Sequence, residues 1–321
     1  MKFGGRLPAG SPVIAHDVGG TFTKSMLVGA DGTILQSLHG PTGGLKRQAQ
    51  ADATSEVRAE LVRRTAKFRK DHPDVAPDAV GVVVPGVVDE REQLARYSAN
   101  LGWHDLPLGR LLSDDLGLPV RLGHDVRAGT LAEHSLGAAQ GVDEVTVVVI
   151  GTGIAAGIVT GGRLVSVGGY AGEVGHAVIL PGGPMCGCGG RGHLEAIASA
   201  GAIAQRYEQA SGDQVDGARE VLRRRNHGDP LARRMWAEAT DALAMYLCML
   251  IATLSPEVVV LSGGLALAGA DLLDPIRDRI EEELTFQRAP DLRLSTLGED
   301  AGMIGAALLA REQPGGGENA G

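Results

Sequence analysis

The chain has 321 residues, of which 44% are hydrophobic and 21% charged, which is ordinary for one large or two medium globular domains. Its formal net charge of −9 disfavours non-specific binding to nucleic acid. With three cysteines and no run of about 18 apolar residues, we expect no disulfide framework, no membrane contact and a cytoplasmic location.

The first apolar segment, "PVIAHDVGGTFTKSMLVGADGTILQSL", begins at Pro12. It predicts a strand, a glycine loop, a second strand, a turn at 29–32 and a third strand. A long amphipathic helix is expected over 45–70. The apolar run 79–89 predicts a buried strand broken at Pro85 and Gly86. A short helix over 108–116 precedes a strand that ends in Asp125, and a further helix runs through 127–139.

The second half opens with "EVTVVVIGTGIAAGIVTGGRLVSV", which repeats the order of the first segment. The two copies begin near Val13 and Val145. Such a duplication implies two similar α/β lobes. We expect a small N-terminal lobe over 12–124 and a large C-terminal lobe over 125–299.

Further helices are expected at 195–210, 217–226 and 230–254, and a buried strand within 257–264. The last helix, about 300–311, is expected to return to the small lobe. The glycine-rich tail 312–321 is expected to be disordered.

The loop "DVGGTFTK" has the composition of a phosphate-binding turn. Gly19 and Gly20 would let backbone N–H groups approach an anion, Thr21 can donate its hydroxyl, and Lys24 can neutralise charge. Asp17 suits the site if it holds Mg²⁺, directly or through water. A hairpin turn with an incidental aspartate explains this loop equally well when it is taken alone.

Two more glycine loops follow apolar strands in the second half, and they contain Gly151, Thr152 and Gly153, and Gly263 and Gly264. Facing each other, three such loops would hold a nucleoside triphosphate. The chain contains no GxxxxGK[ST] motif, and strands rather than helices follow the first two loops. This counts against a P-loop and against a dinucleotide-binding fold.

Asp125, in "RLGHDVRAG", has two interpretations. It can be the base that phosphoryl transfer to a hydroxyl requires. It can also cap the helix that starts near Arg127, and the general preference of aspartate for that position favours the cap when the residues are considered alone.

Five motifs in this order, "DVGGTFTK", "VVVPGVVD", "GTGIAAGIV", "GYAGEVGH" and "CGCGGRGHLE", resemble the signatures of the repressor–open reading frame–kinase (ROK) family. The resemblance covers roughly 12–311. It implies a duplicated actin-like, hexokinase-type (ribonuclease H-like) α/β fold. It also implies ATP-dependent phosphorylation of a hexose or N-acetylhexosamine, with glucokinase the commonest activity, and a homodimer or homotetramer.

The resemblance makes Asp125 the catalytic base and reverses the preference for a cap. The sugar-side positions that it implies are Gly86, Asn100, His124, Glu173, His176 and Glu195. The family usually has Asn-Asp where this chain has His124-Asp125, and that asparagine donates to a sugar hydroxyl. The change bears on which sugar is bound more than on the reaction; alternatively, His124 simply replaces the asparagine contact.

The stretch "GHAVILPGGPMCGCGGRGHLE" carries four candidate zinc ligands, His176, Cys186, Cys188 and His193. The resemblance implies a structural zinc here, with His193 standing where a third cysteine is usual. His176 could bind the metal through one ring nitrogen and a sugar hydroxyl through the other. The alternative is a site that does not close and leaves free thiols. The CxC spacing is not that of a DNA-reading zinc finger.

An ATP-dependent, Mg²⁺-dependent sugar kinase is therefore the expected function. The alternative is a sugar-responsive transcriptional regulator of the same fold. Such regulators carry an N-terminal helix-turn-helix of several dozen residues. Because only 16 residues precede Asp17 in this sequence, we expect a kinase rather than a regulator. A third possibility, a catalytically silent sugar-binding protein, is disfavoured by the presence of Asp17 and Asp125.

Overall fold

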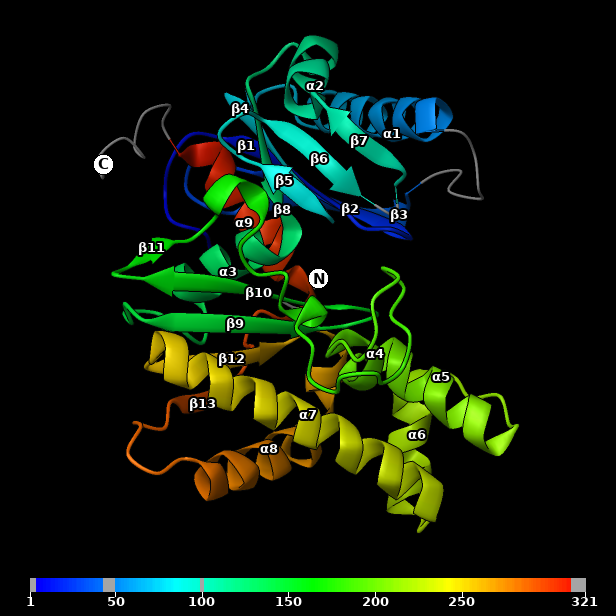
Figure 1. Cartoon of the computed structure of the whole chain (residues 1–321). Coiled ribbons are helices and arrows are strands. Elements are labelled where there is room, and N and C mark those ends of the chain that lie inside the picture. Colours follow the sequence, from blue (N-terminus) through cyan, green and yellow to red (C-terminus); the bar gives the residue numbers. More distant parts are fainter. Residues whose placement is uncertain (1–3, 43–49, 99–100, 313–321) are drawn as a thin grey trace. The chain divides into compact units, whose positions relative to one another are not determined.

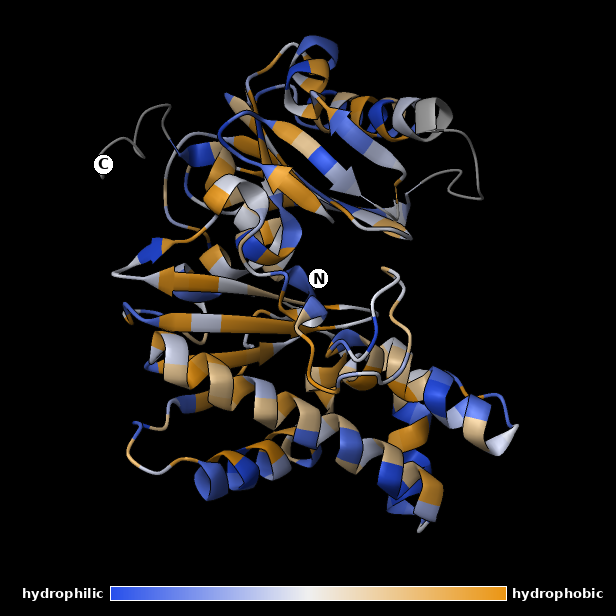
Figure 2. Cartoon of the chain, viewed as in Figure 1, coloured by the Kyte–Doolittle hydropathy of each residue, from blue (hydrophilic) through white to orange (hydrophobic). Residues whose placement is uncertain are grey.

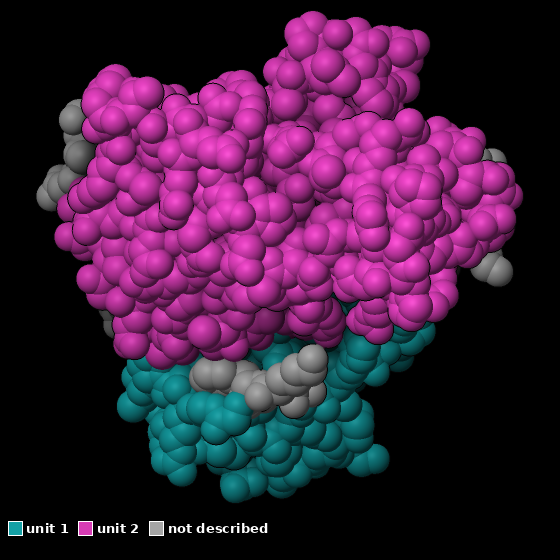
Figure 3. Space-filling view, turned by 90° about the horizontal axis from the view of Figure 1, so that it is seen from below, with its two compact units in different colours: residues 1–132, 166–171, 300–321 teal, residues 133–165, 172–299 magenta. Residues whose placement is uncertain are grey.

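A computed structural model describes residues 4–42, 50–98 and 101–312. Contacts divide the chain into two compact units, which are coloured separately in Figure 3. Unit 1 comprises residues 1–132, 166–171 and 300–321, and unit 2 comprises residues 133–165 and 172–299. The predicted disorder of 313–321 and the predicted helix start at 45–49 fall outside the described residues.

Unit 1 is built around a sheet with the strand order β3-β2-β1-β4-β8 (Figure 1). The strands are β1 (Val13–Val18), β2 (Phe22–Val28), β3 (Ile34–Pro41), β4 (Ala79–Val84) and β8 (Val120–His124). The first three pair antiparallel, whereas β1, β4 and β8 pair in parallel. Parallel pairing brings the carboxyl ends of β1, β4 and β8 to one edge of the sheet.

Helices cover the faces of this sheet. Apolar side chains of α1 (Gln50–Asp71) and α2 (Leu108–Leu116) pack in one cluster with alternate residues of β1 and β4, such as Ile14 and Val82. A second, three-stranded sheet that the sequence did not predict contributes to the same cluster; its strands are β5 (Val87–Asp89), β6 (Leu94–Ser98) and β7 (Trp103–Leu106).

Unit 2 contains a sheet with the strand order β11-β10-β9-β12-β13. Its strands are β9 (Val145–Ile150), β10 (Ile154–Thr160), β11 (Arg163–Leu164), β12 (Val258–Ser262) and β13 (Asp291–Leu294). In Figure 2, β9 and β10 are largely hydrophobic, as expected for strands buried on both faces. The helices are α4 (Glu195–Ala198), α5 (Ala200–Ser211), α6 (Gly217–Asn226), α7 (Pro230–Leu254) and α8 (Ala270–Glu283).

The two sheets repeat one topology. In each, an antiparallel meander supplies three strands, and two later strands add in parallel beside the first. The duplicated α/β fold, predicted from the repeated order of strands and glycine loops in the sequence, is therefore confirmed.

The predicted boundaries around Asp125 and Ser199 were wrong. The strand before Asp125 ends at His124, and Asp125 is instead the first residue of α3 (Asp125–Leu136). The single helix expected over 195–210 is two helices, α4 and α5. Ser199 lies between them in an extended conformation, and its hydroxyl caps α5 by accepting a hydrogen bond from Ala202 N at 3.0 Å.

Helix α7 is long and apolar enough to cross a membrane by length and composition alone. Within unit 2 one side of it packs in the main hydrophobic cluster and against α8 (Figure 1). This packing is a sufficient reason for its apolar composition. Asp229 caps its start, accepting from Leu231 N at 2.8 Å, and Pro230 occupies the first turn.

The last helix, α9 (Ala301–Arg311), lies in unit 1 against β1 and β4. Glycines make this close approach possible. A Cβ atom on Gly81 of β4 would lie 1.8 Å from the carbonyl oxygen of Ala306, and one on Gly305 would lie 2.0 Å from that of Ala128 in α3. Real Cβ atoms do not reach such distances, so a larger side chain would push α9 away from its neighbours.

We predict that Gly305→Ala lowers the free energy of unfolding by about 1–3 kcal/mol. This sign is opposite to that of helix propensity, which favours alanine by about 1 kcal/mol. Gly129→Ala is the matched control, because Gly129 also lies in a helix but a Cβ there would be 3.6 Å from its nearest neighbour, Ala301 Cβ. Urea unfolding measures both; equal stabilities of the two variants would contradict the packing argument.

Candidate active site and metal centre

The parallel strands of unit 1 place three predicted site positions at one edge of its sheet. Asp17 is next to last in β1, Gly86 lies two residues beyond β4, and Asp125 follows β8 directly. The register pairs Asp17 with Val83 of β4, and Val84 of β4 with His124. Since neighbouring strands are about 4.8 Å apart, two strand spacings of about 10 Å separate β1 from β8.

The loop after β1 is a tight turn. Gly19 N donates to Phe22 O at 2.9 Å, and the Thr42 hydroxyl donates to Gly19 O at 2.7 Å. Gly20 is partly buried and Thr21 is exposed at the tip of the turn. No local pattern indicated that Thr42 would hold this loop, because its contact with Gly19 depends on the pairing of β2 with β3.

Asp17 is partly buried, and its cross-strand neighbour in the β1–β2 register is Lys24. Loss of solvation raises the pKa of Asp17 to about 6, while Lys24 acts in the opposite direction. A Cβ on Gly302 in α9 would lie 2.9 Å from Asp17 Oδ2, so the carboxylate rests against the first turn of that helix. A carboxylate desolvated in this way is suited to a cation as partner.

His16 precedes Asp17 in the sequence and His124 precedes Asp125, and both histidines are buried. His16 Nδ1 lies 2.8 Å from Ser25 Oγ and its Nε2 lies 3.1 Å from Thr65 Oγ1. Burial lowers the pKa of His16 to about 3, and nearby Arg64 adds to this effect. Burial likewise lowers the pKa of His124 to about 3, with Arg127 adding to it. Both rings are therefore neutral at physiological pH.

Asp125 opens α3 with its side chain about one-third exposed, and Oδ1 accepts a hydrogen bond from Val126 N at 2.7 Å. It thus takes part in the start of the helix and also meets solvent. The geometry of Asp125 is compatible with a role as a general base and with a role as a helix cap.

Gly86 has a local structural role. Its φ is +107°, and a Cβ there would lie 2.2 Å from Tyr97 O in β6. The close approach that requires glycine is therefore to the chain's own three-stranded sheet. Asn100 lies outside the described residues.

In unit 2, the glycine loops follow two neighbouring parallel strands, β9 and β12. Gly151 and Gly153 form a turn after β9, in which Gly151 N donates to Gly153 O at 2.9 Å, with Thr152 at its exposed tip. Gly263 follows β12 with φ +84°, and a Cβ there would lie 2.5 Å from Ile150 O. The loop that starts at Gly263 and Gly264 therefore lies directly against the loop that starts at Gly151.

Glu195, the first residue of α4, connects the glycine loop with the cysteine loop. Its Oε2 accepts from Ile154 N at 3.0 Å, and Oε1 lies 3.7 Å from Cys186 Sγ. A Cβ on Gly153 would lie 2.5 Å from Oε2. A predicted sugar position and a predicted phosphate position are thus in direct contact within one unit.

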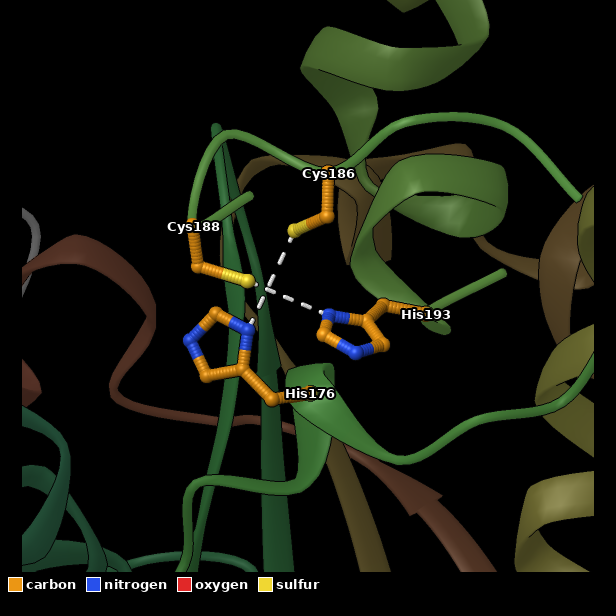
Figure 4. A group of neighbouring side chains, drawn as sticks. All are labelled: His176, Cys186, Cys188 and His193. Carbon is orange, nitrogen blue, oxygen red and sulfur yellow. Dashed lines mark hydrogen bonds between the residues drawn. The ribbon is translucent and has the colours of Figure 1, made fainter. Parts of the chain in front are cut away.

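The four predicted metal ligands gather in one place, as Figure 4 shows. One side-chain atom from each of His176, Cys186, Cys188 and His193 lies within 4.8 Å of the others. Cys186 Sγ is 3.9 Å from His176 Nδ1, and Cys188 Sγ is 3.2 Å from His193 Nδ1. The other ring nitrogen of His176, Nε2, lies 3.9 Å from Glu173 Oε2.

The backbone holds the cysteine loop in this form. Cys186 N donates to Gly190 O at 2.8 Å, and Leu194 N donates to Ala177 O at 2.9 Å. A Cβ on Gly192, where φ is +70°, would lie 1.6 Å from Leu180 O. The hairpin therefore brings His193, at the far end of the cysteine loop, back beside His176.

The donor set matches a tetrahedral transition-metal site. Metal–sulfur bonds of about 2.3 Å and metal–nitrogen bonds of about 2.0 Å place tetrahedral ligand atoms about 3.3–3.8 Å apart. The two sulfur–nitrogen distances in the structure, 3.9 and 3.2 Å, are close to that range. Burial raises the pKa of Cys186, and the side chains of Cys188 and Glu195 add to this effect, whereas a hydrogen bond from the Cys188 backbone acts in the opposite direction.

The sequence did not single out Arg127, whose guanidinium is fully buried in unit 1. It donates to Glu90 Oε1 at 3.0 Å, to Val88 O at 2.8 Å and to Gly169 O at 3.2 Å. Arg127 therefore connects the first turn of α3 with segment 166–171. The sequence could have indicated Arg127 only through its position two residues after Asp125. The residues that it binds lie 37 to 42 residues away along the chain.

The repeated topology, with glycine loops after its parallel strands, defines this protein as a member of the actin-like ATPase-type fold class. The model of the ROK family matches residues 13–313. The chain belongs to the ROK family, as the five motifs indicated.

The chain is similar to several sugar kinases over nearly the whole length of both proteins. A glucokinase from Thermotoga maritima is 33% identical over 323 residues, covering 95% of this chain and 98% of that protein. An N-acetylmannosamine kinase from Escherichia coli is 32% identical, covering 93% and 98%. The crystal structure of a ROK family glucokinase from Streptomyces griseus in complex with glucose and AMPPNP superposes with a TM-score of 0.79, at 28% identity, covering 94% and 100%.

The pKa shifts of His16 and Asp17 make the free energy of unfolding depend on pH in opposite directions. His16 has a lower pKa folded than unfolded, so its contribution to stability rises with pH between about 3 and 6.5. Asp17 has a higher pKa folded than unfolded, so its contribution falls as pH rises from about 4 to 6.

We predict that Asp17→Asn removes this opposing contribution. Its free energy of unfolding, minus that of the unaltered protein, should grow by about 1.4 kcal/mol per pH unit between pH 4.5 and 5.5 and level off above about pH 6.5. Urea unfolding across this range without added nucleotide measures the difference. His16→Gln is the control of opposite sign, and a difference that does not change with pH would refute the assignment.

Proposed function

We propose that this chain is an ATP-dependent sugar kinase that transfers the γ-phosphate of Mg-ATP to a hydroxyl of a hexose, the 6-hydroxyl of glucose in the first instance. The observation that carries the proposal is the common edge of the unit 1 sheet. There, parallel pairing of β1, β4 and β8 aligns Asp17, which suits a cation, with Asp125, which suits a base. Membership of the ROK family and the glucokinase relatives support it.

In the proposed reaction, Asp125 accepts the proton of the sugar hydroxyl while the hydroxyl oxygen bonds to the γ-phosphorus. The bond from the γ-phosphorus to the oxygen that bridges it to the β-phosphate breaks, and ADP leaves. Asp125 then releases its proton to solvent. The partial exposure of its side chain is compatible with contact to both substrate and water.

The backbone at Gly19, Gly20, Gly151 and Gly153 and the hydroxyls of Thr21 and Thr152 are the groups that would bind phosphate. The loop that contains Gly263 and Gly264 would lie near the nucleoside. Asp17 would hold Mg²⁺, directly or through water, and the ion would neutralise charge on the phosphates.

The sugar would contact Glu173, His176 and Glu195 of unit 2. The carboxylates of Glu173 and Glu195 can each accept hydrogen bonds from two hydroxyls. An N-acetylmannosamine kinase is the second candidate, because such a kinase is 32% identical over nearly the whole chain. The two candidates share Asp125 and the phosphate loops, so they differ only in the sugar that supports turnover.

We also propose that His176, Cys186, Cys188 and His193 bind one structural zinc ion. The tetrahedral fit of their ligand atoms supports this assignment. When bound, the metal would stabilise the thiolates and fix the His176 ring through Nδ1, leaving Nε2 on the side of Glu173. The cytoplasmic location, the absence of nucleic-acid and membrane partners, and the homodimer or homotetramer stay predictions.

The first experiment measures sugar-dependent ADP release from Mg-ATP across a panel of hexoses and N-acetylhexosamines. We expect turnover with glucose, and Asp125→Asn should reduce kcat by about 10²–10⁴-fold, the range for loss of a general base. Inorganic polyphosphate in place of ATP tests the donor. A protein that turns over none of the sugars is not the proposed kinase.

Elemental analysis of the purified protein should find about one zinc per chain. Cys188→Ser and His193→Ala should lose it, since three ligands close a tetrahedral structural site poorly, whereas His193→Cys should retain it. Cys248→Ser is the matched control, because Cys248 lies in α7 and is not one of the four ligands. Zinc-free protein, or zinc unaffected by these substitutions, would count against the site.

A further inference from the structure

His124 differs sharply from the residue next to it in exposure. Its side chain is 6% exposed, whereas that of Asp125 is 31% exposed. A residue that binds a sugar hydroxyl must present a polar atom to the substrate. The family resemblance implied such a contact for His124, but its imidazole is turned into unit 1.

Both ring nitrogens of His124 face groups of the protein. Nδ1 accepts a hydrogen bond from Arg127 N at 3.4 Å. A neutral imidazole carries one hydrogen, so when Nδ1 accepts, the hydrogen is on Nε2. Nε2 lies 3.3 Å from Oδ1 of Asp125. Nε2 is therefore the polar atom of His124 that lies nearest to the carboxylate of the proposed base.

The ring stays neutral over the range in which an enzyme of this kind would work, because burial and then Arg127 lower the pKa of His124 to about 3. It therefore adds no positive charge that would weaken Asp125 as a base. A neutral N–H fixes the carboxylate oxygen in direction while leaving its charge in place.

The surroundings hold the ring in this orientation. His124 N donates to Glu90 Oε1 at 3.2 Å, and the same oxygen accepts from Arg127 Nε at 3.0 Å. Arg127 is in turn bound to Val88 O and Gly169 O. The charged groups in contact with His124 are thus Asp125, Glu90 and Arg127, and the last two also bind each other.

We propose that His124 is a positioning residue for Asp125: its Nε2–H holds Oδ1 of the base, and it does not contact the sugar. This inference rests on the proposed kinase function for its kinetic consequence. It predicts that His124 controls the turnover step, which needs an oriented base, and has little effect on sugar binding.

Three variants separate positioning from sugar contact. His124→Leu removes the donor, and we expect kcat to fall by about 10–100-fold while KM for the sugar changes by less than about threefold. The acidic limb of the pH profile of kcat should move to higher pH, because a carboxylate that loses a hydrogen-bond donor is protonated more easily. The amide of glutamine reaches further than that of asparagine and can place a donor near the position of Nε2. His124→Gln should therefore retain most of the turnover that His124→Leu loses.

His124→Asn carries the residue usual in the family. If His124 contacted the sugar, this variant would be the most active of the three, and His124→Leu would raise KM with kcat unchanged. Either result overturns the proposal. Circular dichroism, thermal unfolding and calorimetric binding of the sugar show whether a variant is folded, so that a misfolded leucine variant leaves the glutamine and asparagine comparison intact.

A measurement without turnover separates this proposal from the kinase assignment. Long-range ¹H–¹⁵N NMR of histidine-labelled protein reports which ring nitrogen carries hydrogen. At pH 7 we expect a neutral His124 with hydrogen on Nε2, identified by loss of its signals in His124→Gln. Hydrogen on Nδ1, or a charged ring, overturns the proposal, whereas absence of sugar-dependent ADP release by the unaltered protein overturns the kinase assignment instead.

Discussion

Parallel pairing of the central strands is the constraint on which the rest of the structure depends. In unit 1 it takes β1, β4 and β8, which lie far apart in the sequence, and brings their carboxyl ends to one edge. In unit 2 it does the same for β9 and β12. Asp17 and Asp125, which are far apart in the sequence, are thereby placed at the same edge of one sheet, on β1 and directly after β8.

This arrangement requires the surrounding chain to come very close to the strands. Glycine supplies that closeness at Gly81 and Gly305, where α9 contacts β4 and α3, and at Gly263, where one loop rests on the end of β9. It also explains Gly86, which the sequence assigned to the sugar and which the structure needs for its contact with Tyr97. Close packing is therefore a sufficient reason for glycine at these four positions.

The proposed metal site and the surroundings of Asp125, the proposed base, differ in how far the sequence could predict them. His176, Cys186, Cys188 and His193 lie in one short stretch of the chain, so spacing and ligand type predicted the cluster, and one hairpin brings the four together. The partners of His124 and Arg127 could not be foreseen, because Glu90, Val88 and Gly169 come from segments 34 to 42 residues away. Spacing along the chain carries no information about such contacts.

The sequence by itself determined the duplicated strand order, most helix boundaries, the glycine loops and the ligand types of the metal cluster, because these follow from local hydrophobic periodicity and turn chemistry. The return of the last helix to the first lobe was also expected from the sequence. Only the tertiary structure decided that Gly81 and Gly305 allow its close approach, that Glu195 meets Gly153, and that Nε2 of His124 lies beside Asp125. The direction and burial of a side chain depend on contacts between distant segments, and those exist only once the sheets have formed.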